Sequence, residues 1–277
     1  MTLQTDLASL GHVVRHAPYA YRTSWPLDEV ELERPDGTVL RLLVKRLAGA
    51  DVVKPPFVLD PAREIEAYGM LRDEQLGTPT CYATGRWWIA LERVAGVELW
   101  QCGDLDAWQA AVRWAARLHA RFAGRDMASE HLLRHDEAYY RRWVQRAREL
   151  VGDRIVPLLP AAEVAIGRLT ALPATLIHGE LYASNVIVAG ARLAPVDWEM
   201  AAIGPGVIDL AALLAGWGAV EQHALMSAYG AVDPADVAAA RLQLALQWLG
   251  WAKGWEAPAA HRRDWLEEAR IAAEALR

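Results

Sequence analysis

Apolar and acidic positions alternate near the start of the chain. In residues 28–34, valine and leucine lie between glutamates, and residues 35–37 (Pro-Asp-Gly) lead into a mainly apolar run over residues 39–47. Two period-two segments joined by such a turn predict a β-hairpin. A second apolar run, residues 87–91, predicts a buried strand. We therefore expect the N-terminal third of the chain to be rich in strands.

Beyond about residue 94 the apolar residues recur mostly every three or four positions, the period of a helix with one buried face. Three of these segments begin at an aspartate, namely Asp104, Asp136 and Asp233. No internal repeat, low-complexity segment or flexible linker interrupts the pattern. The sequence predicts an α+β protein with strands mainly first and helices after them.

The composition is that of an ordinary globular protein, since 53% of the 277 residues are hydrophobic and 23% are charged. A net charge of −6 argues against the basic face that nucleic-acid binding needs. Two cysteines, Cys81 and Cys102, are too few for a disulfide framework and favour a reducing, cytoplasmic setting. The N-terminus lacks the features of a signal peptide, and no apolar run approaches about 18 residues, so we expect no membrane span.

The most informative polar residues lie between positions 175 and 210. An apolar strand end is followed by a loop and then by a second predicted hairpin over residues 186–196. Glu180, Asn185 and Asp197 stand at the mouth of this hairpin. Carboxylate and amide oxygens held on short elements suit Mg²⁺ bound to a polyphosphate, although a plain polar loop is the alternative.

The order His-Gly-acid-Leu-x-x-x-Asn from His178, followed by Val-Asp-Trp, resembles the catalytic and metal-binding loops of the aminoglycoside phosphotransferase and choline kinase family. These enzymes are small-molecule relatives of protein kinases. The resemblance covers most of the chain and implies a protein-kinase-like, two-lobed fold. A small β-rich N-lobe would span residues 1–94, and a larger helical C-lobe would span residues 95–277. One departure is Glu180, where the family usually has aspartate.

The resemblance also implies a reaction, in which the γ-phosphoryl group of ATP or GTP passes to a hydroxyl of a small molecule. Asp197 would bind Mg²⁺ with Asn185 as a second ligand. Glu180 would orient the acceptor hydroxyl and take its proton. His178 belongs to the same catalytic loop, and we expect it to brace the loop by hydrogen bonding. The length between residues 197 and 209 leaves no room for the long activation segment of a protein kinase.

The nucleotide would be bound from the N-terminal part. Lys45, at the end of the first hairpin, would neutralise the α- and β-phosphates, unless it is a solvated edge lysine. Glu64, on a helix starting at Asp60-Pro61, would orient Lys45, with an exposed helix charge as the alternative. The chain has no GxGxxG loop, so residues around Ser24 are the candidates to cover the phosphates. By position, the backbone from Glu92 to Val94 would meet the adenine edge.

Three further polar residues have alternative interpretations. Glu199 is expected either to touch substrate or metal or to be an ordinary exposed acid. Asp209 stands among leucines and needs partners, and the resemblance implies that it accepts backbone hydrogen bonds from the catalytic loop. His119 lies on an apolar helix face and is expected to be a hydrogen-bonded core histidine.

Two functions remain open because of Glu180. An extra methylene displaces the carboxylate, and a misplacement of about 1 Å can lower a rate on the order of 10²-fold. The first expectation is an active small-molecule kinase with a refitted site, and the second is a nucleotide-binding protein with little transferase activity. The helical half has mixed charge and is compatible with sugars, aminoglycosides or amino alcohols. We expect a monomer or homodimer, with no nucleic-acid or membrane partner.

Overall fold

The computed structural model describes residues 3–19, 25–48, 54–251 and 263–277. The described N-terminal part contains an antiparallel five-stranded sheet with the order β1-β2-β3-β5-β4. Its strands are β1 (His12–Pro18), β2 (Leu27–Glu33), β3 (Val39–Arg46), β4 (Cys81–Gly85) and β5 (Trp88–Glu92). The predicted β2–β3 hairpin is confirmed.

Alternation in β2 buries Val30 and Leu32 on one face of the sheet, where they pack with Leu42 and Val44 of β3. Helix α1 (Leu3–Leu7) adds Leu7 to this small core. Neither α1 nor β1 was predicted as an element. The predicted buried strand at residues 87–91 is shifted by one position, and Trp87 was wrongly included because its side chain is 44% exposed.

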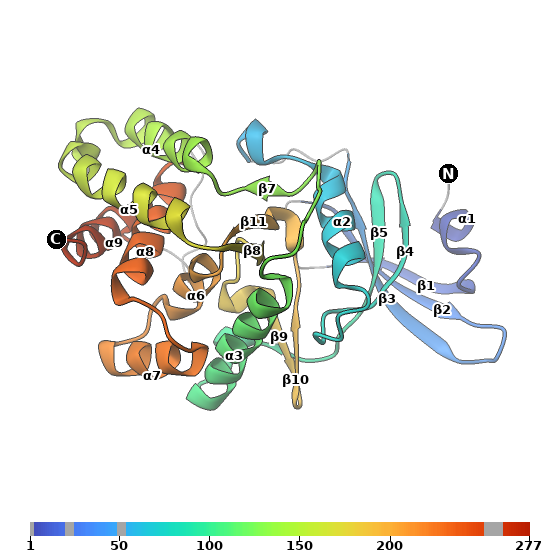
Figure 1. The fold of residues 1–277 in the computed structure, drawn as a ribbon. Helices are drawn as coiled ribbons and strands as arrows, with labels where there is room; N and C mark the ends of the chain where they lie inside the picture. The colour runs from blue at the N-terminus through green and yellow to red at the C-terminus, as the bar shows by residue number, and fades with distance from the viewer. Residues whose placement is uncertain (1–2, 20–24, 49–53, 252–262) are drawn as a thin grey trace.

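Helix α2 (Pro61–Leu71) lies between the sheet and residues 198–200, and it contacts both. The Asp60 side chain accepts a hydrogen bond from the Ala62 N–H, which confirms the predicted helix start. The buried face of α2 includes Glu64, Tyr68 and Leu71. Figure 1 shows α2 beside the sheet, on the side facing the rest of the molecule.

Most of the remaining described chain is helical. The helices are α3 (Leu105–Phe122), α4 (Glu137–Val151), α5 (Leu159–Ala171), α6 (Val207–Leu214), α7 (Ala219–Tyr229), α8 (Pro234–Leu249) and α9 (Trp265–Glu274). The predicted helix starts at Asp104, Asp136 and Asp233 are confirmed, and the side chains of these residues cap α3, α4 and α8. Arg146 of α4 donates hydrogen bonds to the Gly250 and Trp251 carbonyls and so ties α4 to the end of α8.

Short strands lie between the sheet and the helices (Figure 1). One three-stranded sheet joins β6 (Val97–Glu98), β9 (Val186–Ala189) and β10 (Arg192–Pro195). Another joins β7 (Leu133–Arg134), β11 (Ala202–Pro205) and β8 (Ala174–Ile177). The predicted hairpin β9–β10 is confirmed, and its position places the polar loops before and after it at the junction of the two parts.

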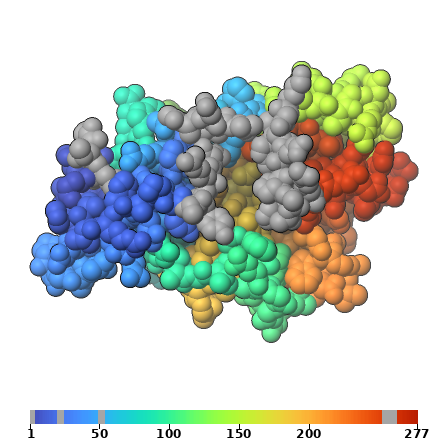
Figure 2. Space-filling model, turned by 180° about the vertical axis from the view of Figure 1, so that it is seen from behind, coloured from blue at the N-terminus to red at the C-terminus, as the bar shows by residue number. Residues whose placement is uncertain are grey.

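Seen from behind in Figure 2, the sheet residues lie at one end of the molecule and the C-terminal helices at the other. The α+β fold is therefore as predicted. No helix in the described residues is long and apolar enough to span a membrane.

Candidate active site

Lys45 of β3 and Glu64 of α2 meet at the inner end of the cleft. Their side chains are 3% and 2% exposed, and Lys45 Nζ lies 2.7 Å from Glu64 Oε2. The alternatives of a solvated edge lysine and an exposed helix acid are thus excluded. A buried ammonium is costly unless carboxylates surround it, so this pair holds Lys45 in one place.

Asp197 approaches Lys45 from the end of β10. Its Oδ1 lies 2.5 Å from Lys45 Nζ, and Glu199 Oε1 lies 2.6 Å from the same atom. Asp197 has φ +65° and ψ +62°, a left-handed conformation that non-glycine residues adopt rarely. This backbone geometry turns the chain at the cleft, where such strained residues often have a functional role.

Carboxylate oxygens of Glu64, Asp197 and Glu199 lie within 4.8 Å of one another. Such a cluster is a candidate metal site by composition, but Lys45 already supplies its positive charge in this structure. Burial alone would raise the pKa of Glu199, but Lys45 and Lys54 hold it well below its usual value. Glu199 is 7% exposed, so it is no ordinary surface acid.

Asn185 follows the catalytic loop and lines the same cleft as Asp197. Its Nδ2 donates a hydrogen bond of 2.9 Å to the backbone carbonyl of Glu180, which orients the amide and leaves Oδ1 for another partner. Oxygen atoms of an amide and a carboxylate are the donor types that Mg²⁺ prefers. The residues at this position therefore fit a magnesium ion.

Glu180 lies in the loop after β8 and is 8% exposed. Among the described residues, no hydrogen-bond donor contacts its carboxylate. Burial raises the pKa of Glu180 to about 7, although the positive charge of Lys54 opposes this shift. A carboxylate with a pKa near neutrality is matched to accepting a proton at physiological pH.

His178 has both ring nitrogens engaged within the loop. Nε2 lies 2.9 Å from the Val196 carbonyl, so it donates, and Nδ1 accepts from the Glu180 N–H at 3.3 Å. The next residue, Gly179, has φ +81°, and a Cβ there would overlap the Met200 carbonyl oxygen. These contacts fit the expected bracing role of His178, and they leave no ring nitrogen free to act as a base.

Asp209 of α6 supports the loop from behind. Its carboxylate is fully buried and accepts hydrogen bonds from the N–H groups of His178 (2.8 Å) and Gly179 (2.9 Å). His119 Nε2 lies 3.1 Å from the same carboxylate and His119 Nδ1 lies 2.7 Å from the Tyr229 hydroxyl. Both the expected backbone contacts of Asp209 and the expected core position of His119 are confirmed.

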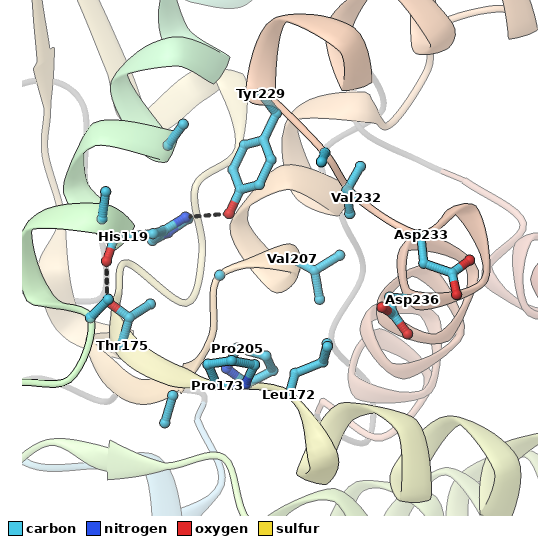
Figure 3. Close-up of a pocket in the computed structure, with 16 residues that line it drawn as sticks. His119, Leu172, Pro173, Thr175, Pro205, Val207, Tyr229, Val232, Asp233 and Asp236 are labelled. Atoms are coloured by element: carbon cyan, nitrogen blue, oxygen red, sulfur yellow. Dashed lines mark hydrogen bonds between the residues drawn. The ribbon is translucent and has the colours of Figure 1, made fainter.

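A cavity of about 380 Å³ lies behind this loop, bordered by His119, Thr175 and Tyr229 (Figure 3). Thr175 Oγ1 donates to the backbone carbonyl of His119, so the cavity wall is tied to α3. The cavity lies on the Asp209 side of the loop, away from the cleft that contains Lys45.

The cleft itself has a volume of about 310 Å³ and extends from Lys45 and Asp197 to Val94. The N–H groups of Glu92 and Arg93 bond to other backbone carbonyls. Among the described residues the Val94 N–H has no partner. In residues 92–94, the predicted hinge that would meet the adenine edge, the Val94 N–H is therefore the backbone donor that remains for a base. The expectation for Ser24 falls outside the described residues.

Sequence reasoning missed three cations at this site. Lys54 Nζ lies 2.5 Å from Glu199 Oε2. Arg63, only 3% exposed, donates to the backbone carbonyl of Glu199 at 2.7 Å. Arg192 of β10 forms a bidentate ion pair with Glu92 at 2.6 and 2.8 Å and so ties the hairpin to the end of β5.

A model of the phosphotransferase enzyme family matches residues 29–244 of the chain. The chain belongs to this family. It is a phosphotransferase that acts on a hydroxyl acceptor, as its resemblance to small-molecule kinases implied. No curated protein matches the sequence.

Solved structures of this phosphotransferase's relatives share its fold at low sequence identity. A choline kinase, LicA from Streptococcus pneumoniae, is 16% identical with a TM-score of 0.71, covering 99% of this chain and 97% of that one. A macrolide 2′-phosphotransferase, MphH from Brachybacterium faecium, is 17% identical with a TM-score of 0.62, covering 99% and 97%. The ADP-bound aminoglycoside phosphotransferase APH(2″)-Ib is 12% identical with a TM-score of 0.62, covering 97% and 95%.

Proposed function

We propose that the protein is a Mg²⁺-dependent kinase that transfers the γ-phosphoryl group of ATP or GTP to a hydroxyl of a small metabolite. The observation that carries this proposal is the buried contact of Lys45 with Glu64 and Asp197, next to the carboxylate of Glu180. A lysine held by a helix glutamate beside a metal-binding aspartate is what phosphoryl transfer requires for positioning the phosphates. The relative with ADP bound also supports use of a nucleotide.

The charges in the cleft support a divalent cation. With their ordinary charges, Glu64, Glu180, Asp197 and Glu199 carry four negative charges against three positive charges on Lys45, Lys54 and Arg63. Asn185 and Asp197 would hold the ion, and Glu199 is the nearest further carboxylate. When bound, Mg²⁺ supplies charge neutralisation for the phosphate oxygens.

Lys45 and Glu180 then have different roles in the reaction. Lys45, released from the acids that now surround it, would bind the α- and β-phosphates. Glu180 would orient the acceptor hydroxyl and take its proton. The bond from the acceptor oxygen to the γ-phosphorus forms as the bond from that phosphorus to the β–γ bridging oxygen breaks. The electron pair of the broken bond stays with the nucleoside diphosphate.

We place nucleotide binding in residues 1–94, and the catalytic loop and acceptor site in residues 95–277. An aromatic side chain of the helical part packs against the catalytic loop: Trp248 Nε1 of α8 donates a hydrogen bond of 2.7 Å to the hydroxyl of the loop residue Tyr182. The three relatives carry the names of very different acceptors, namely choline, a macrolide and an aminoglycoside. Membership of the family therefore does not identify the acceptor of this protein, which has to be determined by experiment.

A panel of hydroxylated metabolites tests the proposal. The protein, Mg²⁺ and ATP or GTP are incubated with sugars, amino alcohols, hydroxy acids and aminoglycosides, and phosphorylated products are detected by mass spectrometry. We expect acceptor-dependent formation of nucleoside diphosphate with at least one class. If the protein binds the nucleotide but phosphorylates no member of the panel, a nucleotide-binding protein without transferase activity is the better description.

A further inference from the structure

A second buried lysine lies beside the cleft, at Glu199, and the family resemblance assigned it no role. Lys54 precedes helix α2, and its side chain is 9% exposed. Its Nζ lies 2.5 Å from Glu199 Oε2 and 5.7 Å from the centre of the Trp251 ring. Because a buried ammonium is costly, its position between an acid and an aromatic face argues for a defined use.

The two lysines occupy successive positions along the site. Glu199 contacts Lys45 through Oε1 at 2.6 Å and Lys54 through Oε2 at 2.5 Å, so one carboxylate separates the two ammonium groups. Lys45 and Asp197 line the cleft that reaches Val94, whereas Lys54 is not among the described residues that line it. Lys54 therefore lies beyond Lys45 on the path from the predicted hinge into the protein.

The charges of Glu180 and Lys54 are close enough to interact. Burial alone would lower the pKa of Lys54, but the charges of Glu199, Glu180 and Asp197 raise it, so the side chain keeps its charge. A nucleotide whose base is at Val94 and whose inner phosphates are at Lys45 would extend its last phosphate towards Glu180. The phosphoryl group in transfer must lie between Asp197 and the hydroxyl that Glu180 holds.

We propose that Lys54 binds the terminal phosphoryl group of the nucleoside triphosphate and stabilises its charge during transfer. This inference rests on the proposed function and adds a catalytic residue to it. The terminal phosphoryl oxygens carry the charge in the transition state, and a positioned ammonium lowers the barrier by interacting with them. The chain has no glycine-rich GxGxxG loop to surround the phosphates, so a second lysine is chemically useful here.

Glu199 has a matching role in this proposal. Before the nucleotide binds, its two carboxylate oxygens contact both lysines at once. When Lys45 turns to the inner phosphates, Glu199 keeps Lys54 charged and directed towards the last one. Arg63 fixes the backbone of Glu199 from the opposite side through a hydrogen bond of 2.7 Å to its carbonyl.

Nucleotide binding tests this role without knowledge of the acceptor. Dissociation constants for Mg-ADP and for the non-hydrolysable triphosphate analogue Mg-AMPPNP are measured by titration calorimetry for the wild type and for Lys54→Met. We expect the variant to bind the triphosphate about 10- to 100-fold more weakly, the effect of losing one charge-assisted contact, and to bind the diphosphate within about twofold of the wild type.

Two further variants make the result specific. Lys45→Met is expected to weaken both nucleotides, because Lys45 contacts the phosphates that they share. Lys54→Arg keeps the charge and should restore most of the preference for the triphosphate. Circular dichroism and thermal unfolding of each variant report on folding.

The outcomes separate this inference from the proposed function. If Lys54→Met weakens both nucleotides equally, or neither, Lys54 does not bind the terminal phosphoryl group and the proposal is overturned while the kinase assignment stands. If the wild type binds neither these adenine nucleotides nor the corresponding guanine pair, the proposed function fails and this inference fails with it. A loss confined to the triphosphate supports the proposal.

Discussion

Two buried carboxylates on opposite sides of the same loop have opposite environments. Asp209, behind the loop, accepts two backbone hydrogen bonds and contacts His119, and these interactions keep its pKa below the usual value despite complete burial. Glu180, in front of the loop, has no hydrogen-bond donor among the described residues, and burial raises its pKa to about 7. The charge of Asp209 is compensated by these partners, and it stabilises the fold. The charge of Glu180 is uncompensated, which leaves its carboxylate free to react but lowers the stability of the fold.

The largest effect on stability is expected at Asp209, the compensated carboxylate. Asp209→Asn places an NH₂ group against backbone N–H donors and removes the charge beside His119. Disrupting a buried, fully paired acid costs about 3–5 kcal/mol, so the free energy of unfolding in urea should fall by that amount. If the free energy of unfolding decreases by less than about 1 kcal/mol, Asp209 does not support the loop.

Glu180→Gln should change stability in the opposite direction, with a dependence on pH. The folded-state pKa of about 7 lies above the ordinary value of about 4.3, so ionisation of Glu180 costs stability as the pH rises between these values. At pH 8 the neutral glutamine should make the protein more stable by up to about 4 kcal/mol. Below about pH 4 the difference should nearly vanish.

Urea denaturation of the wild type and Glu180→Gln across this pH range measures the effect. A constant difference at all pH values would mean that the charge of Glu180 is not the cause. Destabilisation at pH 8 would show that Glu180 has partners that compensate its charge.

The smallest effect on stability is expected at Tyr229, which contacts Asp209 through His119. Tyr229→Phe removes the hydroxyl that lies 2.7 Å from His119 Nδ1 and leaves the contacts of Asp209 in place. One neutral hydrogen bond contributes about 1 kcal/mol, so the unfolding free energy should fall by about that amount. Nucleotide affinity, measured by calorimetry, should stay within about twofold of the wild type.

The sequence predicted residues that regular elements or the family motif position. A strand end placed Lys45 and a helix face placed Glu64, but their pairing was implied by the family resemblance. An acid among leucines was enough to require partners for Asp209. Such placements succeed because hydrophobic periodicity fixes which side of an element is buried.

The contacts of other residues could not be predicted from the sequence, because no hydrophobic periodicity fixes their positions. Lys54 lies just before two prolines in an irregular segment, so no face could be assigned to it. Arg192 occupies the start of a short strand, and its ion pair with Glu92 joins positions 100 residues apart. Glu199 follows a left-handed residue, and only the folded chain shows that two lysines share its carboxylate.

The central claim is that Glu180 is the uncompensated acid that takes the acceptor proton. The direct measurement is the pH dependence of kcat/KM for an accepted substrate, compared between the wild type and Glu180→Gln. We predict a wild-type rate that falls below an inflection near pH 7, and a variant slower by about 10²–10⁴-fold with that inflection lost. A variant that keeps its rate within about tenfold, or keeps the inflection, would contradict the account.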